Sequence, residues 1–223
     1  MCGRYATTRS ETDLTLLFEA DDVTDGFAPS WNVAPTDPVP VIRLSARRNN
    51  ARVLDRAKWG LIPAWSDDPR AGSKMINARA ETVATSPVFG PAFAKRRCLV
   101  PADGWFEWVR DGKRKQPYFM APADGSVLAF AGLWSMWRKD TLTSTIITTE
   151  ATGELARVHH RMPLILPRDR WREWLGSESP RLDPVDAAEI EIRPVGSEVG
   201  KVQNNGPGLI ERHVQEVEIQ TLF

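Results

Sequence analysis

The sequence predicts an α+β fold with mainly antiparallel sheets. Two Asp-Gly pairs, at 111–112 and 124–125, separate runs of alternating apolar residues. Such pairs are typical of tight β-hairpin turns, because both central turn positions need positive φ. Helical patterns are short and few, and no repeat, low-complexity tract or long linker divides the chain. We therefore expect a single domain that spans residues 1–223.

The expected elements follow from local patterns. Ser10 and Asp13 have the spacing of a capping box, and Leu14, Leu17 and Phe18 then lie on one face of a short helix. Three prolines between 31 and 40 predict an extended loop. Apolar runs predict strands at 39–44, 51–61, 104–109, 117–120, 127–133, 143–149 and 163–166. Further short helices are expected at 167–175 and 183–188.

The composition excludes several classes of protein. With 223 residues, of which 42% are hydrophobic, the chain buries a core without help from a metal or a disulfide. Its two cysteines, Cys2 and Cys98, do not make a disulfide scaffold. Its three histidines, His159, His160 and His213, are too few and too badly placed for a metal cluster. We expect no metal and no cofactor.

The sequence shows no sign of a membrane or secretory segment. It has no run of about 18 uncharged apolar residues that would span a bilayer. Residues 1–5 turn polar at once and lack an apolar signal core. We therefore expect a cytoplasmic protein without a membrane partner.

Charge is unevenly distributed, although the formal net charge is zero. Residues 1–40 carry a net charge of −5, residues 41–115 a net charge of +9, and residues 116–223 a net charge of −4. Of the 29 cationic residues, 22 are arginines, whose planar guanidinium suits phosphate. This asymmetry indicates a polyanionic partner. A genomic codon bias toward arginine explains the composition equally well.

Cys2 acquires special chemistry if the initiator methionine is removed, which a small second residue permits. The α-amine and the thiol then sit on adjacent carbons, and an α-amine has a reference pKa of about 7.7–8.0. Such a pair condenses with an aldehyde to an imine, and the sulfur then closes a thiazolidine ring. A cation such as Arg4 would give the thiol thiolate character. Taken alone, however, Cys2 is better explained as an incidental residue near the start.

Three polar residues, Asn77, Glu107 and His159, interrupt apolar segments. Glu107 is expected to share a sheet face with Trp105 and Val109, and burial of that face would raise its pKa toward the range useful for proton transfer. Each residue also has a simpler explanation when taken singly. These explanations are a helix cap before 78–83 for Asn77, a solvated strand residue for Glu107 and a hydrogen-bonded core residue for His159.

Together, a series of motifs closely resembles one family, the SOS-response-associated peptidases, better described as abasic-site processing proteins. The motifs are Met-Cys-Gly-Arg at 1–4, Trp-Asn-Val-Ala-Pro-Thr at 31–36, Trp-Gly-Leu-Ile-Pro-Ala-Trp at 59–65, Asn-Ala-Arg at 77–79, the segment 102–108, His-His-Arg-Met-Pro at 159–163 and Val-Gly-Lys-Val-Gln-Asn at 199–204. Their order and spacing cover essentially the whole chain. The resemblance implies twisted antiparallel sheets that form a pseudo-barrel with short peripheral helices.

The resemblance further implies a sensor of abasic sites in single-stranded DNA, which bonds covalently to the lesion as a thiazolidine and shields the strand from breakage. In this family pattern Cys2 is the nucleophile, Asn77 orients the amine and the ring, and Glu107 is the acid and base. His159, rather than His160, transfers the proton that opens the sugar. The protein is expected to be a monomer that associates with the nucleoid when bound to damaged DNA.

The same resemblance implies a DNA channel. The matching positions are Arg4, Asn32, Trp65, Arg79, Thr148 and Arg161. Relatives can carry a second aromatic residue after Trp65, where this sequence has Ser66, so the resemblance does not extend to a two-ring wedge between bases. We also expect the basic segment 41–115, joined by Arg4 and Arg161, to line one face around the channel.

Three other functions stay open from the sequence. An N-terminal-nucleophile amidotransferase also begins Met-Cys-Gly, but the downstream Asn-Gly-Asp motif of that class is missing. A Cys–His peptidase, suggested by the older family name and capable of removing its own Met1, would pair Cys2 with His159 and leave Glu107 without a role. The non-enzymatic alternative is a module that only binds single-stranded DNA.

Overall fold

The structure, a computed structural model, describes residues 2–112, 114–184 and 189–213. Most of its regular structure is β-strand, and its helices are short. The strands are β1 (Tyr5–Thr7), β2 (Asp21–Asp22), β3 (Ser30–Val33), β4 (Pro38–Ser45), β5 (Ala51–Trp59), β6 (Asn77–Arg79), β7 (Arg97–Ala102), β8 (Gly104–Asp111), β9 (Arg114–Pro122), β10 (Leu128–Trp137), β11 (Thr141–Glu150), β12 (Arg161–Pro163) and β13 (Ile190–Pro194). The α-helices are α1 (Glu11–Phe18), α2 (Gly90–Lys95), α3 (Leu155–Val158) and α4 (Trp171–Gly176).

Five strands close into a barrel. β4 pairs antiparallel with β5 on one side and with β7 on the other, β7 pairs with β10, and β10 pairs with β11. The ring closes where β11 runs parallel to β5, with Thr143 beside Lys58 and Ser144 beside Trp59. Two short strands, β6 and β12, also pair with β11. This barrel and its mostly antiparallel pairing confirm the predicted α+β fold.

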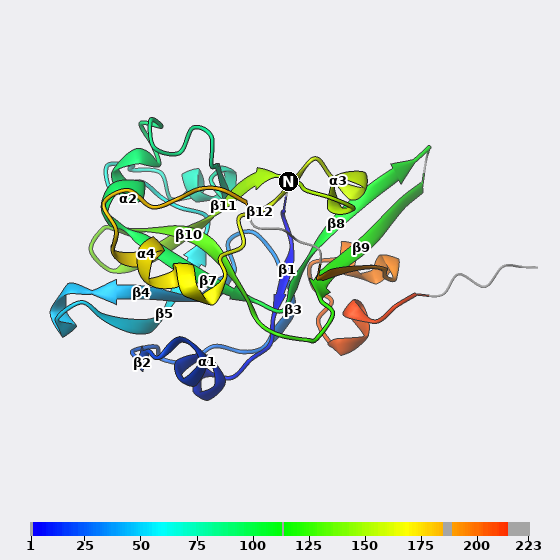
Figure 1. Cartoon of the computed structure of the whole chain (residues 1–223), viewed down its shortest axis with the longest axis horizontal. Helices are drawn as coiled ribbons and strands as arrows, with labels where there is room; N and C mark the ends of the chain where they lie inside the picture. The colour runs from blue at the N-terminus through cyan, green and yellow to red at the C-terminus, as the bar shows by residue number, and fades with distance from the viewer. Residues whose placement is uncertain (1, 113, 185–188, 214–223) are drawn as a thin grey trace, which may run out of the picture.

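A second antiparallel sheet, in the order β13-β9-β8-β1-β3, adjoins the barrel. Figure 1 shows β1 in the middle of the molecule, between the barrel and the ribbon made by β8 and β9. Tyr5 of β1 lies opposite Trp105 of β8, and both rings contact Phe130 of β10 edge-on. This aromatic cluster joins the second sheet to the barrel, because large aromatic rings bury much area at one point. The chain's first residues are therefore brought to the junction.

Helices cover the outside of the barrel. Ser10 and Asp13 form the predicted capping box at the start of α1, and Phe18 at its end stacks on Trp171 of α4 with ring centroids 4.4 Å apart. The helix expected at 167–175 is divided into a 3-10 turn, Arg168–Arg170, and α4. In the described ranges, no helix is long and apolar enough to cross a membrane.

The expectation of a loop over 31–40 is wrong, because this segment holds β3 and the start of β4. Val39 and Val41 are fully buried in the barrel, and their burial favours a strand. Pro38 and Pro40 are tolerated since β4 contacts β7 only from Ile42 onward. The prolines thus occupy an edge-like stretch where a missing N–H breaks no ladder bond.

Three smaller expectations also need correction. Residues 78–83 do not form a helix capped by Asn77: Asn77 begins β6, whose parallel pairing with β11 is stronger than the local helical preference. The strand expected at 163–166 is β12, which ends at Pro163, followed by one bridge from Ile165 to Phe130. Residues 183 and 184 of the helix expected at 183–188 are not helical, and 185–188 lie outside the described residues.

Candidate active site at Cys2

Cys2 lies fully buried at the junction of the two sheets, in one apolar cluster with Trp105 and Ile146. Asn77, the first residue of β6, donates from Nδ2 to the carbonyl oxygen of Cys2 at 2.8 Å. The Arg4 carbonyl accepts a hydrogen bond of 3.0 Å from the N–H of Phe106, so the segment after Cys2 runs along β8. Pairing with two strands that are remote in the sequence thus holds Cys2 in place.

Glu107 comes to the same place from β8. Only 4% of the residue is exposed, and burial raises the pKa of its carboxyl to about 7. The expectation of a buried carboxyl with a raised pKa is therefore confirmed. A carboxyl with this pKa is present in both protonated and charged forms at neutral pH.

His159 stands on the far side of Glu107, directly after α3. Its Nδ1 lies 4.0 Å from Glu107 Oε1. The backbone N–H of Arg161 donates to Nδ1 at 3.0 Å, and the Arg161 carbonyl oxygen lies 3.1 Å from the same atom, so the backbone orients the ring. Burial lowers the pKa of His159, which keeps the imidazole neutral at pH 7.

The structure therefore brings together the four residues expected to be catalytic: Cys2, Asn77, Glu107 and His159. The contacts run in series, from the Asn77 amide to Cys2, from Cys2 to the Glu107 charge, and from Glu107 to the imidazole. Such a group has a nucleophile, an amide and two titratable side chains within one site. No three His, Cys, Asp or Glu side chains in the described ranges lie together as a metal site would need.

The expectation that Arg4 gives Cys2 thiolate character is wrong. Burial and the charge of Glu107 raise the pKa of the Cys2 thiol well above its ordinary value. The Arg4 guanidinium instead donates to Asn32 Oδ1 at 2.7 Å and to the Val199 carbonyl at 2.9 Å. The Cys2 thiol is thus protonated at neutral pH and needs a nearby base to become a nucleophile.

Arg4 and Asn32 fasten the segment 199–204 to β1 and β3. Asn32 is buried, and its Nδ2 donates to the carbonyl oxygens of Lys201 at 3.0 Å and Asn204 at 2.9 Å. The motif at 199–204 is thus hydrogen-bonded to the motif at 31–36. The role expected for Arg4 and Asn32 toward DNA stays a prediction.

A pocket of about 420 Å³ opens beside the site. It is lined by Arg79, Glu150, Ala151, Ala156, His160 and Arg161. Arg79 follows Asn77 by two residues on β6, which places both side chains on the same side of the strand. The His160 ring stacks on His159 at 4.4 Å between centroids, so the pocket adjoins the titratable pair.

Arg161 is held in the pocket wall by two strong contacts. Its guanidinium donates to both carboxylate oxygens of Glu81, at 2.6 and 3.0 Å, and to the carbonyl of buried Thr148 at 2.6 Å. The hydrogen bond from Arg161 lowers the pKa of Glu81. Glu150 and His160 in the pocket wall, and Glu81 that holds Arg161, are not among the residues that the sequence predicted for the site. For Glu81 the only signal was a carboxylate two residues after the Asn-Ala-Arg motif at 77–79.

Trp65 is 69% exposed, at the outer end of a loop that is itself fixed. A Cβ at Gly60 would lie 2.4 Å from the Gly72 carbonyl oxygen, so the loop's two ends touch only because glycine has no side chain. Trp137 Nε1 donates to the Ser66 carbonyl at 2.7 Å. The ring of Trp65 is thus presented to solvent from an anchored turn.

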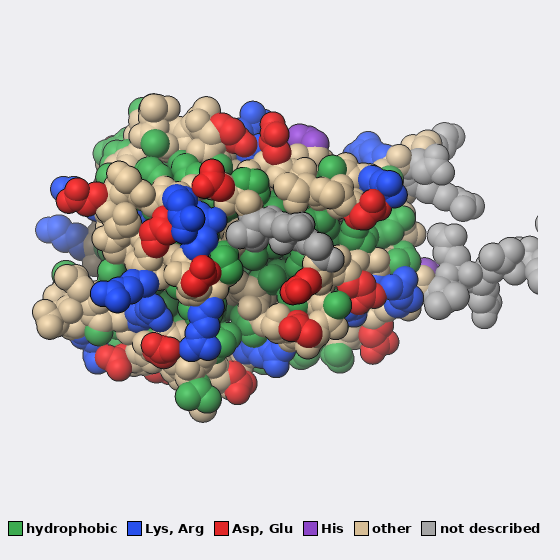
Figure 2. Space-filling view, viewed as in Figure 1, with side chains coloured by type: hydrophobic (Ala, Val, Ile, Leu, Met, Phe, Trp, Pro, Cys, Tyr) green, Lys and Arg blue, Asp and Glu red, His purple; other side chains and the backbone are tan. Residues whose placement is uncertain are grey.

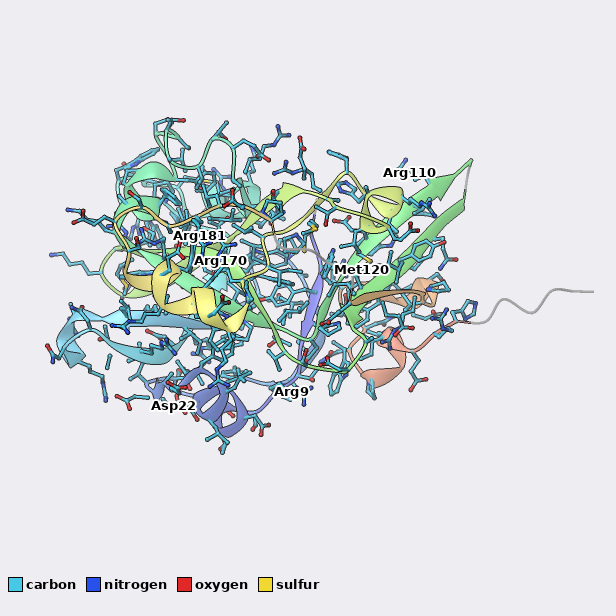
Figure 3. All side chains as sticks on the ribbon, viewed as in Figure 1. Arg9, Asp22, Arg110, Met120, Arg170 and Arg181 are labelled. Carbon is cyan, nitrogen blue, oxygen red and sulfur yellow. The ribbon has the colours of Figure 1, made fainter. Side chains whose placement is uncertain are left out.

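The basic segment 41–115 does not line one face, contrary to expectation. Figure 3 places Arg110 at the tip of the β8–β9 ribbon, whereas Figure 1 shows the β4–β5 hairpin at the opposite end of the molecule. On the face seen in Figure 2, basic and acidic side chains are interspersed. Arg43 pairs with Asp55 at 2.6 Å. Consecutive strands run to opposite ends of the molecule, which disperses charge that is contiguous in sequence.

The fold and the site together define a β-barrel protein whose second residue, a buried cysteine, meets an amide, a carboxyl and an imidazole. The sequence profile described as SOS response associated peptidase (SRAP) matches residues 1–202, and the chain belongs to this family. The resemblance seen in the sequence motifs is therefore confirmed.

Three relatives carry the name abasic site processing protein. The chain is 37% identical to YoqW of Bacillus subtilis (strain 168), over 96% of this chain and 100% of that protein. It is 36% identical to YedK of Escherichia coli (strain K12), over 95% and 99% of the two chains. It is 33% identical to HMCES of Gallus gallus, over 81% of this chain and 65% of that protein.

Solved structures show the same fold. A crystal structure of a protein from Bacteroides thetaiotaomicron matches with a TM-score of 0.83 and 25% identity, over 96% of this chain and all of that one. One from Bordetella bronchiseptica matches with a TM-score of 0.74 and 26% identity, over 87% of this chain and 100% of that one.

Proposed function

We propose that this protein processes abasic sites in single-stranded DNA by forming a thiazolidine crosslink through Cys2, after Met1 has been removed. The observation that carries the proposal is the buried Cys2 beside Glu107, a carboxyl whose pKa is about 7. The names of the relatives support the same lesion as substrate. The family name does not specify covalent chemistry. The support for a covalent step comes from the geometry of the site.

The proposed reaction condenses the aminothiol of Cys2 with the open-chain aldehyde of the abasic sugar. The amine nitrogen bonds to the aldehyde carbon, and loss of one water leaves an imine. The thiol sulfur then adds to the imine carbon, and the thiol proton ends on nitrogen. One water leaves in total, and nothing is oxidised or reduced. The closed ring lacks the imine through which β-elimination would break the strand.

Glu107 serves both halves of this sequence. In its protonated form it donates to the hydroxyl that leaves as water, and in its charged form it takes the proton from the Cys2 thiol. A carboxyl with a pKa of about 7 has both forms available at neutral pH. Because burial raises the pKa of the Cys2 thiol as well, an adjacent base is required for ring closure.

Asn77 positions the reacting amine. Its Nδ2 donates to the Cys2 carbonyl oxygen, so the amide group lies beside Cys2. Asn77 Oδ1 is shielded from solvent and has no hydrogen-bond partner within the described part of the chain. A free α-amine at Cys2 supplies the missing N–H donor, which orients its lone pair for attack on the aldehyde.

His159 relays a proton between Glu107 and the ring oxygen of the sugar, since an abasic deoxyribose is mostly a closed hemiacetal. Its position 4.0 Å from Glu107 fits this role. Arg79 and Arg161 in the neighbouring pocket bind phosphate, and the exposed Trp65 ring stacks on a flanking base. Specificity then comes from the aldehyde, because backbone and stacking contacts tolerate any sequence.

A peptidase with a Cys2–His159 pair is less well supported. Such a pair works with a thiolate, whereas burial raises the pKa of the Cys2 thiol. It also gives no role to the carboxyl of Glu107. A module that only binds DNA does not explain why a titratable group is kept in the apolar junction at a cost in stability.

The proposal is tested by mixing the protein with single-stranded DNA that contains one abasic site. We expect a heat-stable shifted band on a denaturing gel, absent with intact DNA and absent for Cys2→Ala. The intact mass of the protein reports whether Cys2 is the first residue. A preparation that begins at Cys2 and gives no band contradicts the proposal.

A further inference from the structure

A second groove, of about 530 Å³, lies at the end of the barrel that carries the β4–β5 turn. It is formed by the β4–β5 turn, which includes the 3-10 turn Ala46–Arg48, by the end of α2 and by the end of β10. In Figure 1 the β4–β5 turn is the left end of the molecule, while β1, which follows Cys2 closely in the chain, lies in the middle. The groove shares no lining residue with the pocket beside His159.

The groove is strongly basic. Of the residues that the structure describes, six cationic ones and no acidic one line it: Arg43, Arg47, Lys95, Arg96, Arg97 and Lys139. Two of them are already engaged. Arg43 pairs with Asp55 and stacks over Trp134 at 5.0 Å, and buried Arg97 donates to the carbonyls of Trp174 and Phe93. These two form the fixed wall of the groove.

The other four cations have no acidic partner. Arg47, Lys95, Arg96 and Lys139 make no salt bridge with any described residue, and all but Arg96 are exposed. Arg96 Nε is shielded from solvent and has no hydrogen-bond acceptor within the described residues. Four like charges around one hollow produce a positive potential that favours an anion.

We infer that this groove binds phosphate groups of a nucleic acid strand that extends beyond the Cys2 pocket. The ligand is assigned to phosphate because arginine forks match its oxygens and because a strand held at Cys2 presents phosphates at regular spacing. The inference rests on the proposed function for the identity of the strand. It adds a second, sequence-independent contact that sets how much flanking DNA the protein engages.

The test measures binding to intact single-stranded DNA, long enough to reach both ends of the protein, by fluorescence anisotropy over a range of salt. Each phosphate contact contributes about −0.7 to the log–log salt slope, so Arg47→Gln/Lys95→Gln should make the slope shallower by about 1.4. The matched control is Arg110→Gln/Lys115→Gln, two exposed cations on the β8–β9 ribbon, which should leave the slope unchanged. An unchanged slope for Arg47→Gln/Lys95→Gln overturns the inference.

Two further arms separate the alternatives. Inorganic phosphate alone is titrated by calorimetry: tight binding that the groove variant loses, with no change in its DNA salt slope, reassigns the groove to a free anion and overturns the inference. Crosslinking of a short abasic strand that spans only the Cys2 pocket should be equal in wild type and groove variant. Absence of that crosslink in the wild type is instead a failure of the proposed function.

Discussion

Cys2 and Cys98 belong to one apolar cluster and are both fully buried, yet their immediate surroundings differ. Cys98 lies in the barrel wall on β7, packed so closely that a Cβ at Gly132 would be 2.9 Å from its sulfur. Burial raises the pKa of the Cys98 thiol, and the nearest charge that acts on it is the Arg43 guanidinium. Cys2 has the same burial but faces Glu107 and Asn77.

The difference shows that burial alone makes a thiol inert. Both thiols are protonated at neutral pH, but only Cys2 has a neighbour with a pKa of about 7 that is suited to take its proton. At this junction, strands from the two sheets each place one polar side chain beside Cys2, Asn77 from β6 and Glu107 from β8.

The largest effect is expected from replacing Cys2 with alanine, and the same replacement at Cys98 is its control. Cys2→Ala should abolish the heat-stable crosslink, because the remaining α-amine forms only a labile imine. Cys98→Ala should crosslink at the wild-type rate and lose only about 1–2 kcal/mol of stability, the scale of a small core truncation. Gel assays and urea denaturation measure these outcomes. Loss of crosslinking by a folded Cys98→Ala variant would end the contrast between the two sites.

The second prediction concerns the pH dependence of stability. The pKa of Glu107 is about 7 in the folded protein against a reference of 4.5, so the folded state binds the extra proton between these values. Stability should therefore fall as pH rises from about 4.5 through 7, by up to about 3 kcal/mol in total. Glu107→Gln should remove this fall and be the more stable protein at pH 8. Urea denaturation at pH 5 and pH 8 checks it, and equal pH dependence of both proteins counts against a buried charge.

The third prediction concerns the rate of crosslinking. Glu107→Gln should slow crosslink formation by about tenfold or more at pH 7, within the range that a positioned acid or base supplies, and still permit it. The inflection near pH 7 in the wild-type rate should disappear in the variant. Single-turnover time courses across pH provide the measurement. A variant that keeps the wild-type pH profile would assign the inflection to another group.

The smallest effect is expected at His159. His159→Ala should form a crosslink that reverses severalfold more slowly, because opening of the thiazolidine loses its proton relay. The crosslink is formed first and then chased with excess unlabelled abasic DNA. His160→Ala is the matched control, since His160 stacks on His159 but lies in the pocket wall. Exchange of the His159→Ala crosslink at the wild-type rate would remove His159 from the mechanism.

Several features of the fold were predictable because they depend on local chemistry. The capping box at Ser10 and the turn at the Asp-Gly pair 111–112, which joins β8 to β9, act over a few residues, and alternation along 104–109 predicted a shared sheet face for Glu107 and Trp105, both of which are buried. The hairpin expected at the Asp-Gly pair 124–125 is wrong, because β9 and β10 on its two sides pair in different sheets. The prolines of 31–40 wrongly predicted a loop. A strand accepts a proline where no neighbouring strand pairs with that side, and whether β7 lies alongside cannot be read from the local sequence. Likewise, a helix cap was the simpler local explanation for Asn77, because parallel pairing with a strand near residue 146 is not visible locally.

The sequence by itself determined the family and the residue types available for chemistry, since ordered motifs and hydrophobic alternation are properties of the chain alone. Only the tertiary structure decided which of these groups meet and in which ionisation state. Arg4 is close to Cys2 in sequence but donates its hydrogen bonds to Asn32 and Val199. Burial, together with the charge of Glu107, which is remote in sequence, raises the pKa of the Cys2 thiol. The physical reason is that pKa values depend on desolvation and on charges nearby in space, both of which arise only when distant strands pack together.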